Sequence, residues 1–313
     1  MIKQMEIIGD SKVGILDGEA DVLGLCRQIA MNKDKDDNDE AFMLVDLDLV
    51  FERYQLWKRE LPMIEVRKSS VLFTVIRVLD VLRLLEKGCF HVGSGCNDPT
   101  AYREALAHAR NLMDIGEGLG FCMKILDLGG GYPGSAHHTS FESIAAVIRS
   151  AVDEFFPEGM GVRLIAEPGR FFAAAPFTLV CNVIHATEVS AEKITKQPED
   201  SEHTGYMYYI NDGVYGSFNC ILFDHVQPEG VPLFDEIAEE YPTTIWGPTC
   251  DSLDKVEDKK HMRRLSVGDW ILYSNMGAYT CSASTTFNGF QRPTPVYVIN
   301  RENWSEISSS PYI

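Results

Sequence analysis

Two apolar strands in the middle of the chain are each followed directly by a glycine-rich turn and an amphipathic helix. The strands with their turns are Phe90–Gly95 and Lys124–Gly131, and the helices that follow are expected over 101–116 and 141–156. A further short strand is expected over Arg163–Glu167. Strand, glycine loop and helix in succession predict parallel strands with crossover helices, as a barrel or a doubly wound sheet.

Three N-terminal segments show different patterns. Residues 41–64 predict a strand, Phe42–Val45, and an amphipathic helix that stops at Pro62. The charged segment 31–40 predicts a solvated loop, and the apolar spacing over 71–85 predicts a helix packed on the surface.

Beyond residue 174 the pattern changes to short β-rich runs with polar connectors, which predicts a second, mostly antiparallel β domain. The runs are Phe177–Ile184, Tyr206–Ile210, Thr243–Trp246, Asp269–Tyr273 and Thr294–Ile299. We therefore expect an α/β fold plus a β domain. The predicted parts are an N-terminal segment 1–40 that packs with the β domain, a barrel-type domain 41–173 and a β domain 174–313.

Composition excludes several classes of protein. The 313 residues include 28 Lys plus Arg and 46 Asp plus Glu, a net charge of −18, which disfavours nucleic acid and anionic membranes as partners. No apolar run approaches the ~20 residues that span a bilayer, and the first residues lack the features of a secretory signal, so a cytoplasmic location is expected. The eight cysteines show no zinc spacing, and no metal site is expected.

Several polar residues lie where parallel strands end. Three glycines at 129–131 can direct backbone N–H groups at a phosphate, although a tight βα turn explains them equally well. Glu167 and Arg170 at the next strand end suggest partners for a ring nitrogen and a phosphate, with a surface ion pair as the alternative. His91 offers a ring for stacking and Ser94 a hydroxyl for an anion, but a lone histidine is more often structural.

The β domain contains a second group of candidates. The sequence WGPTCDSLD places Cys250 and Asp251 in a Gly- and Pro-containing loop, where exposed functional side chains are common, although a cysteine there is more often inert. Asp224 and Tyr279 lie near other strand ends and carry little information individually.

Taken together, these motifs resemble eukaryotic ornithine decarboxylases, a family of pyridoxal phosphate (PLP)-dependent decarboxylases that also includes the antizyme inhibitors. The matching motifs, in order, are FHVGSGC, LDLGGGYPG, AEPGR, NDGVYGSFNCILFDH, WGPTCDSLD, VGDW, NMGAYT and FNGFQRPT. The resemblance implies a PLP-binding (β/α)8-type barrel, a C-terminal β domain and a cytoplasmic homodimer with shared active sites. It also implies decarboxylation of L-ornithine to putrescine in polyamine biosynthesis.

The resemblance also assigns roles to residues of this chain. His91 would stack on the pyridoxal ring, and Cys250, from the other subunit, would protonate the carbon that loses its carboxylate. The cofactor would be held by Ser94, Gly129, Gly130, Gly131, Glu167, Pro168, Gly169, Arg170 and Tyr279, with Glu167 on the ring nitrogen. The distal ammonium of ornithine would meet Asp224 and Asp251, with Phe223 where tyrosine is common in the family.

One departure is large. Relatives carry a strand ending in P-F-Y-A-V-K, whose lysine binds the cofactor covalently, and this chain has no such stretch. The stretch 41–173 is about half the ~250 residues of a complete barrel, so several βα units are missing. Lys68 is the nearest lysine, but Arg67 and Ser69 flank it instead of an apolar strand, which would leave its pKa unlowered and its amine a poor nucleophile.

Three hypotheses account for this departure. In the first, the gene encodes a working ornithine decarboxylase, and this chain is a shortened splice form or an incorrect gene prediction. In the second, the chain is a non-enzymatic regulator similar to antizyme inhibitors, with antizyme as its partner, although the family's antizyme-binding surface lies mainly in the missing stretch. In the third, the open barrel edges prevent stable folding.

Overall fold

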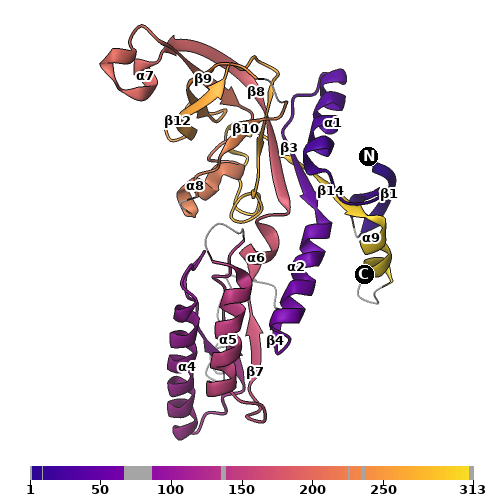
Figure 1. The fold of residues 1–313 in the computed structure, drawn as a ribbon, viewed down its shortest axis with the longest axis vertical. Helices are drawn as coiled ribbons and strands as arrows, with labels where there is room; N and C mark the ends of the chain where they lie inside the picture. Colours follow the sequence, from indigo (N-terminus) through magenta and orange to yellow (C-terminus); the bar gives the residue numbers. More distant parts are fainter. Residues whose placement is uncertain are drawn as a thin grey trace. The chain divides into compact units, whose positions relative to one another are not determined.

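A computed structural model of the chain describes residues 2–8, 10–66, 87–134, 139–224, 226–234 and 237–309. The chain forms two compact units. The β unit consists of Met1–Phe51 and Ala175–Ile313, and the α/β unit consists of Glu52–Ala174 (Figure 1).

The α/β unit contains a four-stranded parallel sheet in the order β4-β7-β6-β5. Its strands are β4 (Ile64–Val66), β5 (Lys87–Cys89), β6 (Ile125–Asp127) and β7 (Arg163–Ala166). Its helices are the end of α2 (Leu47–Glu60), which starts in the β unit, then α4 (Thr100–Gly118), α5 (Phe141–Phe155) and α6 (Gly169–Ala173). The parallel arrangement predicted from the strand–loop–helix succession is confirmed.

The two faces of this sheet differ because successive strand residues point to opposite sides. On one face Ile64, Leu164 and Leu126 lie in register across three strands and share a buried core with the helices. On the other face Ile125 is only half-buried, and Arg163 pairs with Glu65 while both side chains remain about half exposed. Among the described residues, helices therefore cover one face of this four-stranded sheet, and we call the other its open face.

Trp57 of α2 lies at the centre of the α/β core. Its side chain is 1% exposed, its Nε1 donates to the carbonyl oxygen of Ile64 at 3.1 Å, and its ring stacks on Phe141 of α5 at 5.4 Å between centroids. Helix α5 starts where the Ser140 side chain accepts a hydrogen bond from the N–H of Ser143, which satisfies one of the unpaired donors of the first turn. The apolar side chains of α5 then face this core at helical spacing.

The β unit is built on a ten-stranded mixed sheet whose main order is β1-β2-β14-β3-β8-β9-β11-β12, with β10 and β13 off this path. Its strands are β1 (Ile2–Ile8), β2 (Ser11–Leu16), β3 (Phe42–Asp46), β8 (Phe177–Ser190), β9 (Thr204–Ile210), β10 (Gly230–Pro232), β11 (Glu240–Trp246), β12 (Lys255–Arg263), β13 (Trp270–Tyr273) and β14 (Thr294–Asn300). Its own helices are α1 (Val22–Lys35), α7 (Glu192–Thr195), α8 (Cys220–Phe223) and α9 (Arg301–Ser308). Most strand pairs are antiparallel, as predicted.

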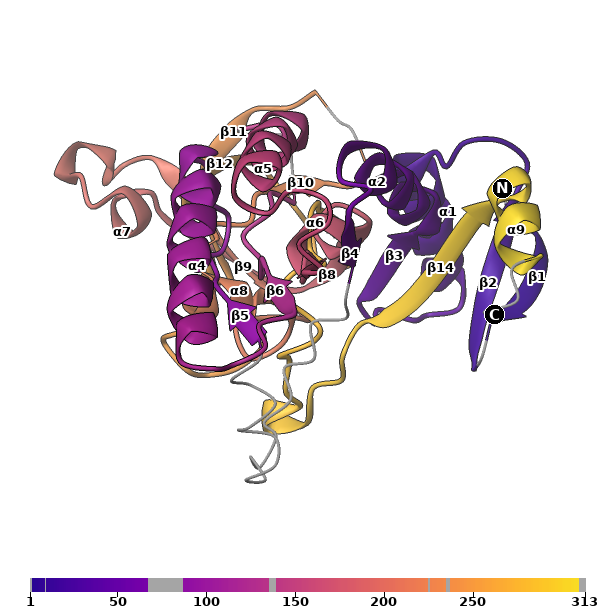
Figure 2. The ribbon, with the colours of Figure 1, turned by 90° about the horizontal axis from the view of Figure 1, so that it is seen from below.

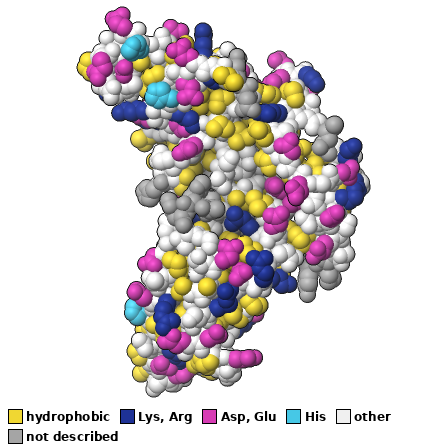
Figure 3. Space-filling view, in the orientation of Figure 1, with side chains coloured by type: hydrophobic (Ala, Val, Ile, Leu, Met, Phe, Trp, Pro, Cys, Tyr) yellow, Lys and Arg dark blue, Asp and Glu magenta, His cyan; other side chains and the backbone are white. Residues whose placement is uncertain are grey.

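Both ends of the chain contribute to this unit. Strand β14 lies between β2 and β3 and is parallel to both, so residues 252 to 284 positions apart in sequence are neighbours (Figure 2). The buried carboxylate of Asp48 accepts hydrogen bonds from the N–H of Asn300 and from Asn303, which fixes the start of α9. Acidic side chains are scattered over the visible face of this unit and do not form one patch (Figure 3).

Three sequence expectations need correction. The segment 31–40 is not all loop, because α1 continues to Lys35 and Trp270 Nε1 donates to Asp34 at 2.9 Å. The strand predicted from Phe90 lies three residues earlier, as β5, and the chain leaves the sheet at Phe90. Strand β3, expected in the barrel-type domain, instead pairs with β14 and β8, so the first boundary falls after Phe51. The helix expected over 71–85 lies outside the described residues.

The asymmetry of the parallel sheet leads to a stability prediction. Replacing Leu126 by Ala removes a fully buried side chain and should cost about 2–5 kcal/mol of unfolding free energy. Replacing Ile125, its neighbour on the open face, by Ala should cost less because that side chain is only partly buried. Urea denaturation of both variants measures the difference, and equal losses would show that the second face is packed as tightly as the first.

Candidate functional site

Three loops of the α/β unit meet at one edge of the parallel sheet. They follow the carboxyl ends of β5, β6 and β7, which lie side by side because these strands are parallel and in register. The residues that the sequence singled out there are His91, Ser94, Gly129–Gly131, Glu167 and Arg170. We call this group the strand-end cluster.

Direct contacts hold the strand-end cluster together. The Arg170 guanidinium donates to Ser94 Oγ from Nη2 at 2.9 Å and from Nε at 3.2 Å. The N–H of Glu167 donates to the carbonyl oxygen of Gly129 at 2.8 Å, and the N–H of Cys96 donates to that of Gly131 at 3.1 Å. A cation and a hydroxyl thus lie next to a glycine loop, an arrangement that suits an anionic group.

The glycine loop allows no side chains. A Cβ at position 129 would lie 2.2 Å from the carbonyl oxygen of Phe90, and one at position 130 would lie 2.8 Å from His91 Nε2. Gly131 has φ +103° and little free space around it, with Val92 2.6 Å from where a Cβ would stand. The buried Asp127 carboxylate accepts from the N–H of Gly129 at 2.9 Å and anchors the start of the loop.

Neighbouring groups fix His91 and Glu167. His91 is exposed, and its Nδ1 accepts the N–H of Gly93 at 2.9 Å, so a neutral ring carries its proton on Nε2. Glu167 is half-buried directly after β7, Pro168 is buried, and Gly169 starts α6. The sequence did not single out Asp127, although an acid two residues before a glycine run is the signal that would have found it.

The remaining expected residues lie in the β unit. Cys250 is exposed in the loop Gly247–Asp254, which we call the Cys250 loop. Asp251 is half-buried and accepts from Tyr215 Oη at 2.5 Å and from the N–H of Leu253 at 2.9 Å. The Leu253 N–H first, and then the Tyr215 hydroxyl, hold the pKa of Asp251 below its usual value, so this carboxylate stays charged at lower pH.

A second turn contacts the Cys250 loop, and a third segment contacts Asn219, which lies just after that turn. The turn Asn211–Ser217, called the Tyr215 turn, supplies the hydroxyl to Asp251, and the Asn219 side chain just after it donates to the carbonyl oxygen of Thr280 at 2.7 Å. Tyr279, next to Thr280, is exposed and has φ +56°. Phe223 is exposed at the end of α8, and Asp224 follows it, half-buried.

The two units therefore divide the expected site residues between them. The strand-end cluster belongs to the α/β unit, whereas Phe223, Asp224, Cys250, Asp251 and Tyr279 belong to the β unit. Lys68 lies outside the described residues. Among the residues that the structure describes, no three His, Cys, Asp or Glu side chains form a group that could hold a metal, and no helix is long and apolar enough to cross a membrane.

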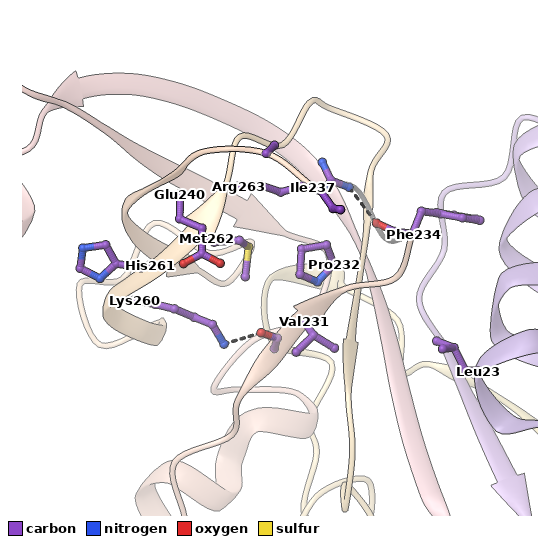
Figure 4. Close-up of a pocket in the computed structure, with 12 residues that line it drawn as sticks. Leu23, Val231, Pro232, Phe234, Ile237, Glu240, Lys260, His261, Met262 and Arg263 are labelled. Atoms are coloured by element: carbon purple, nitrogen blue, oxygen red, sulfur yellow. Dashed lines mark hydrogen bonds between the residues drawn. The ribbon is translucent and has the colours of Figure 1, made fainter.

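A separate cavity of about 550 Å³ lies in the β unit between β10 and β12 (Figure 4). It is lined by Val231 and Pro232, by the end of β12 and by Leu23 of α1. Lys260 at its wall donates to Glu257 at 2.9 Å and to the carbonyl oxygen of Gly230. None of the residues expected from the sequence lines this cavity.

Comparisons with known proteins identify the class. The family described as pyridoxal-dependent decarboxylase, pyridoxal binding domain, matches residues 87–174. An ornithine decarboxylase of Caenorhabditis elegans is 46% identical over 423 aligned residues, which cover 100% of both chains. Because this alignment is longer than the 313 residues of the chain, stretches of that relative have no counterpart here.

Other relatives match over a shorter range. An ornithine decarboxylase of Panagrellus redivivus is 51% identical over 223 residues, 70% of this chain and 51% of that protein. An antizyme inhibitor 2 of Xenopus laevis is 44% identical over 223 residues, 70% of this chain and 48% of that protein. These alignments span about half the length of each relative.

Solved structures share the fold. The lysine/ornithine decarboxylase of Vibrio vulnificus, complexed with cadaverine, superposes with a TM-score of 0.74 and 21% identity over 92% of this chain and 99% of that one. The class is therefore that of the pyridoxal-dependent decarboxylases, which are carboxy-lyases. Within it, the chain belongs to the ornithine decarboxylase family. The family, the fold class and PLP as the cofactor, all expected from the motifs, are confirmed.

The glycine loop provides a local test. Gly131 and Gly159 share a positive φ, +103° and +98°, but no atom lies within 4 Å of a Cβ at Gly159. Both Ala variants incur the cost of that conformation, about 1–2 kcal/mol, and only G131A also clashes with Val92 and Gly93. We expect the larger fall in melting temperature for G131A. Equal falls would mean that the loop can move to accept a side chain.

Proposed function

We propose that the chain is an ornithine decarboxylase-type protein that binds PLP and L-ornithine but lacks the lysine that other members use to hold the cofactor covalently. The observation that carries this proposal is the Arg170–Ser94 pair beside a glycine loop in which no Cβ fits. A guanidinium, a hydroxyl and closely approaching backbone match the charge and size of a phosphate. The residues present therefore fit the cofactor.

In the α/β unit, Arg170, Ser94 and the Gly129–Gly131 loop would hold the phosphate. His91, with Nδ1 anchored by Gly93, would present the face of its ring to the pyridine ring. Glu167 would accept a hydrogen bond from the protonated pyridine nitrogen and so keep that nitrogen charged, and Pro168 and Gly169 would shape the turn between Glu167 and Arg170. When bound, PLP supplies an electron sink for the pair released as carbon dioxide leaves.

In the β unit, Asp251 and Asp224 would bind the distal ammonium of ornithine, beside Phe223, and Tyr279 would reach the phosphate. The lowered pKa of Asp251 supports this role, because a carboxylate that stays charged is a suitable partner for a cation. The exposed thiol of Cys250 would donate a proton to the carbon that loses carbon dioxide. We propose that Cys250 of one subunit acts in the active site of the other subunit of a cytoplasmic homodimer, as in the family.

Because the lysine is absent, we expect the chain to bind PLP without catalysing the decarboxylation of ornithine. We expect purified chain treated with PLP and borohydride to show no lysine adduct by mass spectrometry, at Lys68 or elsewhere, and no release of carbon dioxide from ornithine. Reversible binding should remain, detected by absorbance or by fluorescence quenching. A specific trapped lysine with measurable decarboxylation would show that this chain is itself a complete enzyme.

Phosphate recognition is tested with two arginines of the same unit. R170Q should weaken binding of PLP on the order of tenfold or more, since one charge-assisted hydrogen bond contributes about 1.5–3 kcal/mol. R163Q, which removes only the pair with Glu65, should bind as the parent chain does. Fluorescence titration with PLP and with pyridoxal measures both effects. A loss that is equal for the two ligands would argue against Arg170 as the phosphate partner.

A regulator similar to the antizyme inhibitors is the second candidate. The missing lysine segment favours it, and antizyme inhibitor 2 proteins are among the relatives. A pull-down of antizyme with the purified chain tests this second candidate. If antizyme does not bind, only the first proposal remains.

A further inference from the structure

Two buried carboxylates lie where the Cys250 loop meets the Tyr215 turn, and one of them joins the two segments. Asp254 is 0% exposed and accepts three hydrogen bonds, from the N–H of Val214 at 2.7 Å, from the N–H of Thr249 at 2.9 Å and from Thr249 Oγ1 at 2.6 Å. One side chain therefore ties the loop that carries Cys250 to the turn that carries Tyr215.

Asp212 organises the turn from its other end. It is 4% exposed, and its Oδ1 accepts from the N–H of Gly213 at 2.8 Å and of Ser217 at 2.9 Å. Its Oδ2 is buried and has no hydrogen-bond partner among the described residues. A cavity of about 20 Å³, enough for one water molecule, is lined by both Asp212 and Asp254.

The backbone is built around these two acids. A Cβ at Gly213 or Gly247 would lie 2.2 or 2.1 Å from Asp254 Oδ1, and one at Gly216 would lie 1.9 Å from Asp212 Oδ1. The three glycines thus permit a close approach that no other residue allows.

We propose that Asp254 holds the Cys250 loop against the Tyr215 turn, that Asp212 fixes the shape of that turn, and that both are positioning residues that set where Cys250 and Asp251 are presented. The Tyr215–Asp251 hydrogen bond depends on this connection, because its two partners lie on the two joined segments. The inference rests on the proposed function for the roles of Cys250 and Asp251, but the loop geometry can be measured without activity.

The contact between the Cys250 loop and the Tyr215 turn should depend on pH. Burial first, and then the negative charge of Asp254, raise the pKa of Asp212 to about 6. The other titratable groups that face Asp212 are Cys181 of β8, Tyr273 of β13 and Cys281. Since the folded state holds this proton more tightly than the unfolded state, the stabilisation is present at low pH and is lost as pH rises through about 6.

Hydrogen exchange of the full chain tests the proposal, with protection factors corrected for intrinsic rates. D254N and T249V should lower the protection of Val214 and of the Cys250 loop by about tenfold, as expected for one lost hydrogen bond to a charged group. T249S keeps the hydroxyl donor and should restore the protection. If D254N does not fold, T249V alone still tests the proposal.

Two further variants separate a local role from a general one. D48N removes a buried carboxylate elsewhere in the β unit and should lower overall stability while leaving the protection of the Cys250 loop unchanged. D212N should abolish the fall in loop protection that we expect of the parent chain as pH rises from about 4 to about 6.

A chemical readout completes the test. The rate of Cys250 alkylation by iodoacetamide, measured relative to that of Cys89, an exposed thiol of the α/β unit, should change in T249V and D254N because the released loop presents the thiol differently. Unchanged protection and alkylation in T249V, or the same changes in D48N, would overturn the proposal. Failure of the proposed function would appear separately, as absence of PLP binding in the parent chain.

Discussion

The register of the four short parallel strands is the constraint on which the α/β unit depends. Ile64, Leu164 and Leu126 lie in one row and are buried against the helices, so a slip of one residue would expose all three. The same register brings the ends of β5, β6 and β7 to one edge. The glycine loop, Ser94 and Arg170 meet there because the buried row leaves the strands no other alignment.

Buried carboxylates organise the glycine-rich loops of both units. Asp127 accepts the N–H of Gly129 in the α/β unit, and Asp254 accepts the N–H groups of Val214 and Thr249 in the β unit. In each case a glycine without a Cβ lets neighbouring atoms approach the backbone closely. Protein donors instead of water then stabilise the negative charge of the carboxylate. Such loops can present exposed polar groups in fixed positions without a larger surrounding structure.

The incomplete barrel affects the proposed chemistry more than the proposed binding. Residues on the open face of the sheet, such as Ile125 and Arg163, are partly exposed where a closed barrel would enclose them. The groups proposed for the phosphate and for the pyridine ring lie on the strands that are present, whereas relatives carry the covalent lysine on a strand that this chain lacks. Binding and turnover can therefore be studied apart in this chain.

Local sequence patterns predicted the longer helices of the α/β unit and several strands of both units, but not helix α1 or strands β1, β2, β4 and β10. Helices α2, α4 and α5 and strands β6 to β9 follow from hydrophobic spacing, because that spacing reflects which face is buried. Strand β12 was missed because Lys255–Arg263 is mostly charged, as suits the edge of a sheet, and the place of β3 was missed because its partners β8 and β14 are distant in sequence. Only the tertiary structure decided which loops meet and that Asp212 and Asp254 support them, since these buried acids are recognisable only from the donors that folding brings to them.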